Sequence, residues 1–343
     1  MEDTTLCVLD LLEAAPARIS RRGFLEGGLS VGMATALVEI RDVMLTPGVA
    51  EGAETAPASG GPGTSGVNFR WLGTNGWEIR FGNRTVLVDP WLSRTEAGFF
   101  SGKPNPDALL TLEAGLIDQH VTRADHILIG HGHFDHIADV PYIAKKTSAM
   151  VIGSESHMNM LRAYGIPEDR LVACRGGELM QFDGYAIEVI PSLHALAPNK
   201  KVPFPGRLTS VPGVPQTIKD MPDGDTFIYL LTIDRKFQVF LMSSGNFSER
   251  AISGLKPDVA LVAPFGRSQI HDFTPRLLKA LNFPRIVLPT HWDNWERPVT
   301  QPPEDGRARL GNDGNLDIFV KELKGASPKS RVVVLKYFES FAP

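Results

Sequence analysis

The chain has 343 residues, of which 43% are hydrophobic and 22% are charged, so it is long and apolar enough to bury a large core. Its 35 lysines and arginines against 39 aspartates and glutamates give a formal net charge of -4, which excludes the strongly basic surface of a dedicated nucleic-acid-binding protein. Two cysteines are too few for a disulfide scaffold or a thiolate zinc cluster. We therefore expect a small-molecule substrate, while the composition says nothing about oligomeric state.

The N-terminal segment, residues 1–45, has the pattern of an export signal. Arg21 and Arg22 stand shortly before 12 uncharged residues from Gly27 to Val38, which is a signal-peptide length and too short for a transmembrane helix. The paired arginines resemble the twin-arginine signal, which implies the export machinery as a partner and a periplasmic or extracellular location. Acidic residues before the arginines depart from that pattern. The alternative is an amphipathic helix that packs on the catalytic part of a cytoplasmic protein.

Residues 46–66 are rich in Pro, Gly, Ala and Ser and contain almost nothing that a core would bury. This composition is typical of a flexible linker. The sequence therefore predicts that the catalytic domain covers residues 67–343.

After the predicted linker the sequence changes to short β-rich runs that are separated by turns. The first three runs, at 67–72, 77–81 and 85–88, predict a β-meander. Further strands are predicted at 126–129, 149–152, 185–190, 227–233, 237–242, 259–262, 285–288 and 332–337, and helices at 137–146, 157–164, 248–253 and 274–282. Strands come first and then alternate with helices, which predicts an α/β fold of sheet layers covered by helices.

Three histidines and one aspartate follow directly after the strand predicted at 126–129. They are His131, His133, Asp135 and His136, in the pattern H-x-H-x-D-H. Burying so many polar groups is costly without a cation, and imidazole and carboxylate are ligands of Zn²⁺, Fe and Mn²⁺. The close spacing lets one loop offer ligands to two neighbouring ions. We therefore predict a metal site here that holds one or two ions.

With this loop the sequence resembles the metallo-β-lactamase superfamily over roughly residues 67–300. The resemblance implies a four-layer αββα sandwich and gives roles to residues beyond the loop. Asp89 matches the aspartate that braces the metal loop, His194 matches the third ligand of the first ion, and His291 matches the last ligand of the second ion. The opening Leu72-Gly73-Thr74 is most similar to the branch of ascorbate-6-phosphate lactonase and N-acyl phosphatidylethanolamine phospholipase D.

Asn246 stands where the superfamily has its bridging aspartate, after the strand predicted at 237–242. An amide oxygen can coordinate an ion, so Asn246 is a candidate ligand, but it lacks the charge that helps to hold two dications close together. Three arrangements stay open: a dinuclear site with a weaker second ion, a mononuclear site, or a bridge supplied by substrate or solvent. The alternative for Asn246 is a turn residue after a strand.

The resemblance implies a metal-dependent hydrolase in which a metal-activated water is the nucleophile and Asp135 orients it or handles its proton. Zn²⁺ is the expected cofactor, with Mn²⁺ or Fe as alternatives. We expect a lactone, ester or amide substrate with an apolar part, and a phosphodiester is the alternative substrate. A non-catalytic exported metal-binding protein is the alternative from another class, and an oxygen-handling diiron enzyme ranks last.

Candidate substrate-binding residues lie in loops at the sheet edge that is predicted to carry the ligands. Arg267 and His271 follow the strand predicted at 259–262, and Trp292 is adjacent to the predicted ligand in the loop after the strand at 285–288. A Pro-rich segment, residues 195–225, begins directly after His194 and is predicted to form a wall or lid over the metals.

Overall fold

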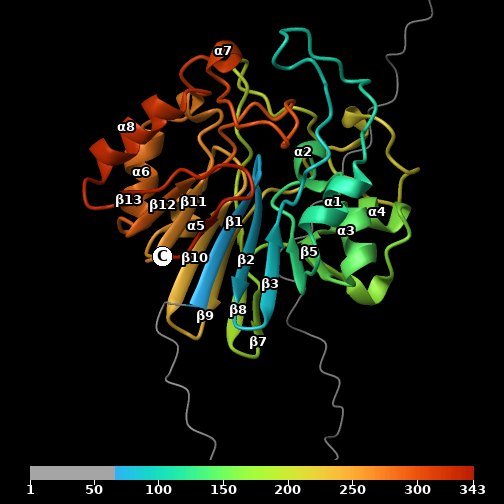
Figure 1. Ribbon diagram of the computed structural model, residues 1–343, viewed down its shortest axis with the longest axis horizontal. Helices are drawn as coiled ribbons and strands as arrows, with labels where there is room; N and C mark the ends of the chain where they lie inside the picture. The colour runs from blue at the N-terminus through green and yellow to red at the C-terminus, as the bar shows by residue number, and fades with distance from the viewer. Residues whose placement is uncertain (1–65) are drawn as a thin grey trace, which may run out of the picture. The chain divides into compact units, whose positions relative to one another are not determined.

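The computed structural model describes residues 66–343. The predicted signal-like segment 1–45, and all of the predicted linker 46–66 except Gly66, lie outside the described residues. Two sheets of seven strands each lie face to face, and helices cover the outer face of each sheet (Figure 1). This is the four-layer αββα sandwich that the sequence predicts. In the described part, no helix is long and apolar enough to cross a membrane.

The first sheet has the strand order β14-β1-β2-β3-β4-β5-β6. Its strands are β1 (Val67–Gly73), β2 (Gly76–Phe81), β3 (Arg84–Val88), β4 (His126–Leu128), β5 (Met150–Ser154), β6 (Leu171–Cys174) and β14 (Ser340–Phe341). The strands β1, β2 and β3 are antiparallel neighbours, so the predicted meander is confirmed. The strands β3 to β6 are parallel to one another.

The second sheet has the strand order β13-β12-β11-β10-β9-β8-β7. Its strands are β7 (Leu179–Phe182), β8 (Tyr185–Pro191), β9 (Phe227–Ile233), β10 (Phe237–Met242), β11 (Val259–Val262), β12 (Ile286–Pro289) and β13 (Arg331–Val332). Strand β9 is antiparallel to both β8 and β10, whereas β10, β11, β12 and β13 are parallel. Therefore β8, β10 and β12 all run in one direction.

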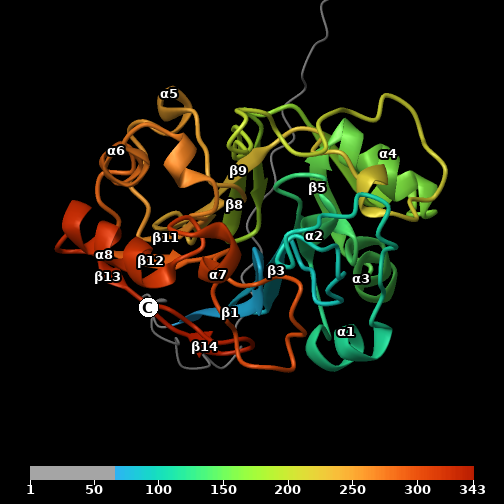
Figure 2. The same cartoon turned by 90° about the horizontal axis from the view of Figure 1, so that it is seen from above.

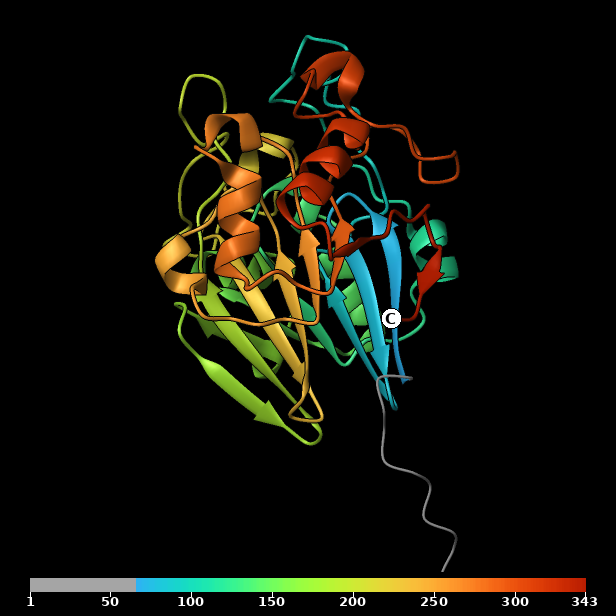
Figure 3. The ribbon, with the colours of Figure 1, turned by 90° about the vertical axis from the view of Figure 1, so that its left-hand side faces the viewer.

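Helices lie on the two outer faces, as the view from above shows (Figure 2). The first sheet is covered by α1 (Ala114–His120), α2 (Phe134–Ile137), α3 (Val140–Thr147) and α4 (Glu155–Ala163). The second sheet is covered by α5 (Glu249–Ile252), α6 (Phe273–Ala280) and α8 (Leu316–Ala326), which face the viewer in Figure 3. The short helix α7 (Arg307–Leu310) lies beyond one end of the sheets (Figure 1).

The apolar side chains form three clusters, one between the sheets and one beneath each layer of helices. Between the sheets, Phe69 and Ile79 of the first sheet are buried in one cluster with Leu231 and Tyr229 of the second. The Tyr229 hydroxyl also donates a hydrogen bond of 2.7 Å to the carbonyl oxygen of Ile129, just before the predicted metal loop. The core thus ties the second sheet to the strand that carries this loop.

Two sequence-based boundaries are wrong. The helix predicted at 137–146 begins only at Val140, as α3, while Ile137 ends α2. Between the two helices the buried Asp139 accepts hydrogen bonds from the backbone of Leu92 (2.6 Å) and Ser93 (2.9 Å). The strand predicted at 332–337 ends at Val332. Beyond it the chain crosses to the first sheet, where β14 pairs with β1.

Candidate metal centre

Three of the predicted ligands, His131, His133 and His194, come together from loops that follow strands of the two sheets, and we name them the first group. The two histidines from the loop after β4 lie opposite His194, which follows β8. One nitrogen of each imidazole lies within 4.8 Å of those of the other two. This is the set that the sequence assigned to the first ion, and the fold brings it together.

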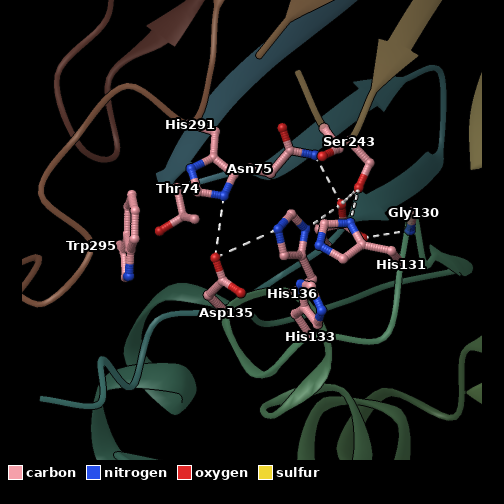
Figure 4. A network of polar contacts seen from close by, with 12 residues as sticks. Thr74, Asn75, Gly130, His131, His133, Asp135, His136, Ser243, His291 and Trp295 are labelled. Carbon is pink, nitrogen blue, oxygen red and sulfur yellow. Dashed lines mark hydrogen bonds and ion pairs between the residues drawn. The ribbon is translucent and has the colours of Figure 1, made fainter. Parts of the chain in front are cut away.

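Three further predicted ligands, Asp135, His136 and His291, lie beside the first group, and we name them the second group (Figure 4). Asp135 and His136 are in α2, and His291 follows β12. The Asp135 carboxylate is 3.2 Å from His291 Nε2 and 3.6 Å from His136 Nε2. Asp135 and His136 also lie within 4.8 Å of His131, so the two groups adjoin.

The backbone of the metal loop, residues 130–137, needs glycine at two positions. A Cβ on Gly130 would lie 2.0 Å from the Cβ of Ser243, and a Cβ on Gly132 would lie 2.4 Å from the carbonyl oxygen of Pro222. The loop is also hydrogen-bonded to the second sheet, because Phe227 donates its N–H to the Gly130 carbonyl at 2.7 Å. The glycines therefore let this loop pack directly against the second sheet.

Asp89 lies beneath the metal loop, is fully buried, and accepts hydrogen bonds from four groups. One oxygen accepts from the Gly130 N–H at 2.6 Å. The other accepts from Asn75 Nδ2 at 2.8 Å, Ser243 Oγ at 2.9 Å and His136 Nδ1 at 2.8 Å. These are the contacts that the predicted bracing role of Asp89 requires.

Hydrogen bonds behind the ligands fix which nitrogen of each ring is free. Because Ser243 donates to Asp89, its oxygen accepts the proton of His131 Nδ1 at 2.9 Å. His194 Nδ1 donates to the Ala195 carbonyl at 2.7 Å. The Nε2 atoms of His131 and His194 therefore both carry lone pairs, and they face each other at 3.2 Å. Two such lone pairs repel unless a cation lies between them.

Hydrogen bonds also determine which ring nitrogen is free in the remaining two histidines of the metal loop. His133 Nε2 donates to the Pro203 carbonyl at 2.9 Å, which leaves the Nδ1 lone pair free. His136 Nδ1 donates to Asp89, and its buried Nε2 has no hydrogen-bond partner in the described part of the chain. Free lone pairs, an orphaned buried nitrogen and a carboxylate fit a divalent cation with nitrogen and oxygen ligands. The residues present thus fit the metal that the superfamily implies.

Electrostatics keeps the first group and Asp135 in the forms that bind metal. Burial lowers the pKa of all three histidines in the first group, to about 4 for His133. Burial acts to raise the pKa of Asp135, but the neighbouring imidazoles of His136 and His291 outweigh it and hold that pKa below its usual range. At neutral pH the first group is therefore uncharged and Asp135 is ionised.

His291 is held in a left-handed backbone conformation, with a φ of 50°, which costs a residue other than glycine about 1–3 kcal/mol. Its ring centroid lies 6.1 Å from that of the stacked Phe265 ring and 5.3 Å from that of Trp295, which is nearly perpendicular to it. Its buried Nδ1 has no hydrogen-bond partner among residues 66–343. The surrounding structure therefore confines His291, and other contacts must offset the free-energy cost of its backbone conformation.

The structure does not bring the side-chain oxygen of Asn246 to the other candidate ligands as a bridge. Asn246 Nδ2 donates to the carbonyl of His194 at 3.0 Å, and its Oδ1 accepts from the backbone N–H of Phe247 at 2.9 Å. Backbone groups thus occupy both ends of the amide, as expected if Asn246 is a turn residue, which was the alternative role. In this arrangement Asn246 holds the loop of His194, and the second group has no bridging carboxylate from position 246.

A cavity of about 460 Å³ opens beside both groups. Five of the six ligand side chains line it; His136 lies behind them. Much of the remaining lining is apolar and comes from Phe99, Phe134, Phe204, Phe265, Trp295 and Leu310. Residues 195–198, 203 and 204 form part of the wall, so the Pro-rich segment 195–225 lies beside the metal centre as predicted.

The three predicted substrate-binding residues do not line this cavity. Arg267 is buried and its guanidinium donates to Glu322 at 2.9 Å, so it braces the second layer of helices. The His271 side chain is 83% exposed. Trp292 stacks on Trp71 at 5.0 Å and belongs to the core between the sheets. A position in a loop after a strand therefore did not place these side chains at the site.

Other residues at the site escaped the sequence-based prediction. Ser243, which orients His131, directly follows the strand predicted at 237–242, and that position was a usable signal. Asn75 lies in the turn between the first two strands. Arg309 lines the cavity and donates to the Phe99 carbonyl at 3.0 Å, but nothing in its local sequence indicated this.

Comparisons with known proteins agree with the fold and with the metal loop. The family model described as the metallo-beta-lactamase superfamily matches residues 69–169. A metal-dependent hydrolase of Pyrobaculum arsenaticum is 26% identical over 74% of this chain and 96% of its own length. Another, from Myxococcus xanthus, is 27% identical over 82% of this chain and 85% of its own length.

Solved structures share the fold at lower identity. Igni18, a metallo hydrolase of Ignicoccus hospitalis, is 20% identical with a TM-score of 0.52 and covers 80% of this chain and 97% of its own. A protein of Veillonella parvula described as a possible metal-dependent hydrolase is 14% identical with a TM-score of 0.53, over 81% of this chain and 100% of its own. None of these four is named a lactonase or phospholipase, so the predicted branch stays a prediction. The chain is therefore similar to the metallo-β-lactamase superfamily over the residues that carry the metal loop, and it is a metal-dependent hydrolase with the metallo-β-lactamase fold.

Proposed function

We propose that the chain hydrolyses a lactone, an ester or an amide that carries an apolar group. The observation that carries this proposal is the position of the two ligand groups in the wall of a largely apolar cavity. An apolar acyl or alcohol group buried there would gain about 0.8 kcal/mol per methylene. The polar ligand side chains lie on one side of the same cavity, where a scissile carbonyl would meet them.

The two ligand groups have separate roles in this proposal. We propose that the first group holds one ion and the second group a second ion, with Zn²⁺ as the metal and Mn²⁺ or Fe as alternatives. When bound, the metal would polarise the scissile carbonyl and supply a water that is acidic enough to attack at neutral pH. Asp135 lines the cavity and is ionised, so it is suited to orient this water and to accept its proton.

Aromatic side chains would bind the apolar group and exclude water from it. Phe204 lies 6.0 Å from the His133 ring, and Phe99 packs against Phe204 and Phe134. Trp295 packs edge-on against His291 on the other side. These contacts join the apolar lining directly to the ligand side chains, so the bound group would lie next to the reacting atoms.

A phosphodiester is less well supported as the substrate. The segment 195–225 has four basic residues that could meet an anionic group, but none of them lines the cavity: Lys200, Lys201, Arg207 and Lys219. Arg207 pairs with Asp225, and Lys200 donates to Gln269. Among the described residues, Arg309 is the one lysine or arginine of the lining. We therefore favour substrates whose scissile group is neutral.

A substrate panel tests the proposal. The full chain is loaded with Zn²⁺, verified by elemental analysis, and assayed on p-nitrophenyl esters of increasing acyl length, on γ-lactones, on aryl amides and on bis-p-nitrophenyl phosphate. We expect kcat/KM to rise by about fourfold per added methylene until the cavity is filled, and the phosphate diester to be the poorest substrate. The matched control is His131→Ala, which should lose metal and activity together.

Three results would count against the proposal. Faster cleavage of the phosphate diester than of any ester would favour the phosphodiesterase alternative. A metal-loaded chain that hydrolyses none of the panel would favour the non-catalytic metal-binding protein. Full turnover by His131→Ala with a verified absence of metal would refute the metal-dependent mechanism itself.

Export is a separate proposal that rests on Arg21 and Arg22 and on the uncharged run from Gly27 to Val38. We propose that they direct the chain through twin-arginine machinery to the periplasm or the exterior. Replacing both arginines with lysine should retain the protein in the cytoplasm, as cell fractionation would measure. Equal distribution of the variant and the natural chain would favour the cytoplasmic alternative.

A further inference from the structure

A buried ion pair lies next to the metal centre but contributes no ligand to it. Arg94 Nη2 is 3.1 Å from Asp293 Oδ2, and the two side chains are 3% and 0% exposed. Removing both charges from water has a large free-energy cost that their mutual attraction must offset. A buried ion pair by itself is therefore weak evidence of a role in stability. Its neighbours indicate a different role.

Asp293 uses its other contacts to hold the turn between β1 and β2. Both of its oxygens lie 3.1 Å from the backbone nitrogen of Thr74. Its Oδ2 also accepts a hydrogen bond of 2.7 Å from the hydroxyl of Tyr337. Arg94 donates to the hydroxyl of the same Thr74. The charged pair therefore fixes one short piece of backbone from several directions.

Thr74 in turn holds the metal ligand His291. The His291 N–H donates to the Thr74 carbonyl at 2.7 Å, and Thr290 Oγ1 donates to the same oxygen at 2.9 Å. Thr74 and His291 both have left-handed backbone conformations, with φ angles of 49° and 50°. The loop after β12 therefore binds the peptide groups on both sides of Thr74, one through Asp293 and the other through His291.

We propose that Arg94, Asp293 and Tyr337 form a positioning clamp that holds His291 in place for the second ion. The clamp joins the ligand loop after β12 to the first sheet, from which the other two members of the second group come. This inference rests on the proposed metal centre and deepens it by naming what determines whether the second ion binds.

The second group depends on such a clamp more than the first group does. Asp135 and His136 are adjacent in α2, so their relative positions are fixed locally. His291 comes from the opposite sheet, and Asn246 provides no bridging carboxylate that would hold an ion between the groups. The position of His291 therefore decides whether the second group closes around an ion.

The test is a titration of the chelator-treated full chain with Co²⁺, followed by calorimetry and by visible absorption, without substrate. The natural chain should bind two ions in two steps. Asp293→Asn removes the charge that holds both Thr74 and Arg94, and it should weaken the second step about 10- to 100-fold while leaving the first step unchanged. Tyr337→Phe removes one hydrogen bond and should weaken the same step by less.

The matched control is Glu78→Gln. Glu78 is also a buried carboxylate of the first sheet, 1% exposed and 3.2 Å from Arg70 Nε and 2.9 Å from Arg80 Nε, but it contacts no ligand. This variant should lose thermal stability and keep both binding steps. The comparison separates a general loss of stability from a specific loss of the second ion.

Three results would overturn the clamp: two unchanged steps in both Asp293→Asn and Tyr337→Phe, an equal loss of the second step in Glu78→Gln, or a natural chain that binds one ion only. Failure of the proposed function gives a different result. A chain that binds two ions and responds to these variants as expected, but hydrolyses no substrate of the panel, would refute the hydrolysis and leave the clamp standing.

Discussion

The metal loop after β4 and the ligand-bearing loops of the second sheet reach the same cavity by different means. The metal loop supplies four candidate ligands within six residues, and their spacing is set by the loop and by α2. The second sheet supplies His194 and His291 singly, from separate loops after β8 and β12. Both are also positioned by contacts with parts of the chain that are far away in the sequence.

This difference indicates where the metal centre is robust and where it is sensitive. His194 is held through the Ala195 carbonyl and through Asn246, and His291 is held through Thr74. Loss of such contacts can move one ligand without unfolding the domain. Asp89 is the residue common to both regions, because it binds the metal loop and Ser243 of the second sheet at once.

The largest expected effect is that of Asp89→Asn. It removes a fully buried charge that accepts four hydrogen bonds, so we expect a loss of about 3–5 kcal/mol of stability and a 10- to 100-fold weaker binding of metal. Chemical denaturation and Zn²⁺ titration measure the two effects. The matched control is Asp139→Asn, a buried aspartate that binds the backbone of Leu92 and Ser93 but touches no ligand. If both variants weakened metal binding equally, Asp89 would have no special link to the centre.

The next largest expected effect is that of pH on the stability contributed by His157, which packs against the metal loop. His157 is buried against Gly132 and accepts a hydrogen bond of 3.0 Å from the Ser154 N–H. Burial lowers its pKa from 6.5 to about 4. The unfolded chain therefore binds a proton between pH 6.5 and 4 that the folded chain excludes. The stability contribution is present above pH 6.5 and is lost as the pH falls, by about 3 kcal/mol in total.

Denaturation of His157→Asn across this pH range isolates the effect. The asparagine can accept the same backbone hydrogen bond but does not titrate, whereas the ligand histidines titrate in both proteins. The difference between the two stability curves should therefore change mainly between pH 6.5 and 4. Parallel curves throughout this range would show that His157 does not exclude the proton in the folded state.

A smaller effect is expected for Asn246→Asp. The new carboxylate would face the His194 carbonyl, where the amide now donates at 3.0 Å, so the metal-free protein should lose about 1–3 kcal/mol. Rotation toward a bound ion would relieve this repulsion, and the gain in Tm on adding Zn²⁺ should exceed that of the natural chain. The control is Asn159→Asp, because Asn159 makes the same kind of bond to the Leu208 carbonyl far from any ligand. An equal metal response in both variants would contradict a bridging role for residue 246.

The contrast between local and distant determinants also explains how much of the molecule the sequence predicts. The meander and the metal loop follow from local patterns, and both are present. The strand predicted at 332–337 fails because a distant contact intervenes: the Tyr337 hydroxyl binds Asp293, and the chain leaves the sheet to reach it. The contacts of Arg267 were likewise hidden, because its partner Glu322 belongs to α8, a helix that no sequence pattern had indicated.

The smallest expected effect concerns a residue that the sequence placed at the substrate and the structure does not. The His271 side chain is 83% exposed, pairs with the neighbouring Asp272 at 3.3 Å and does not line the cavity. His271→Ala should therefore change the stability and the kcat/KM of the best panel substrate by no more than about 0.5 kcal/mol each, roughly twofold in rate. The companion variant is Trp295→Leu, which alters the cavity lining and the edge contact with His291 and should raise KM for long acyl groups. A tenfold loss of kcat/KM in His271→Ala at unchanged stability would mean that the loop of His271 closes over bound substrate. The sequence-based assignment of His271 to the substrate site would then be right, because the loop would move when substrate binds.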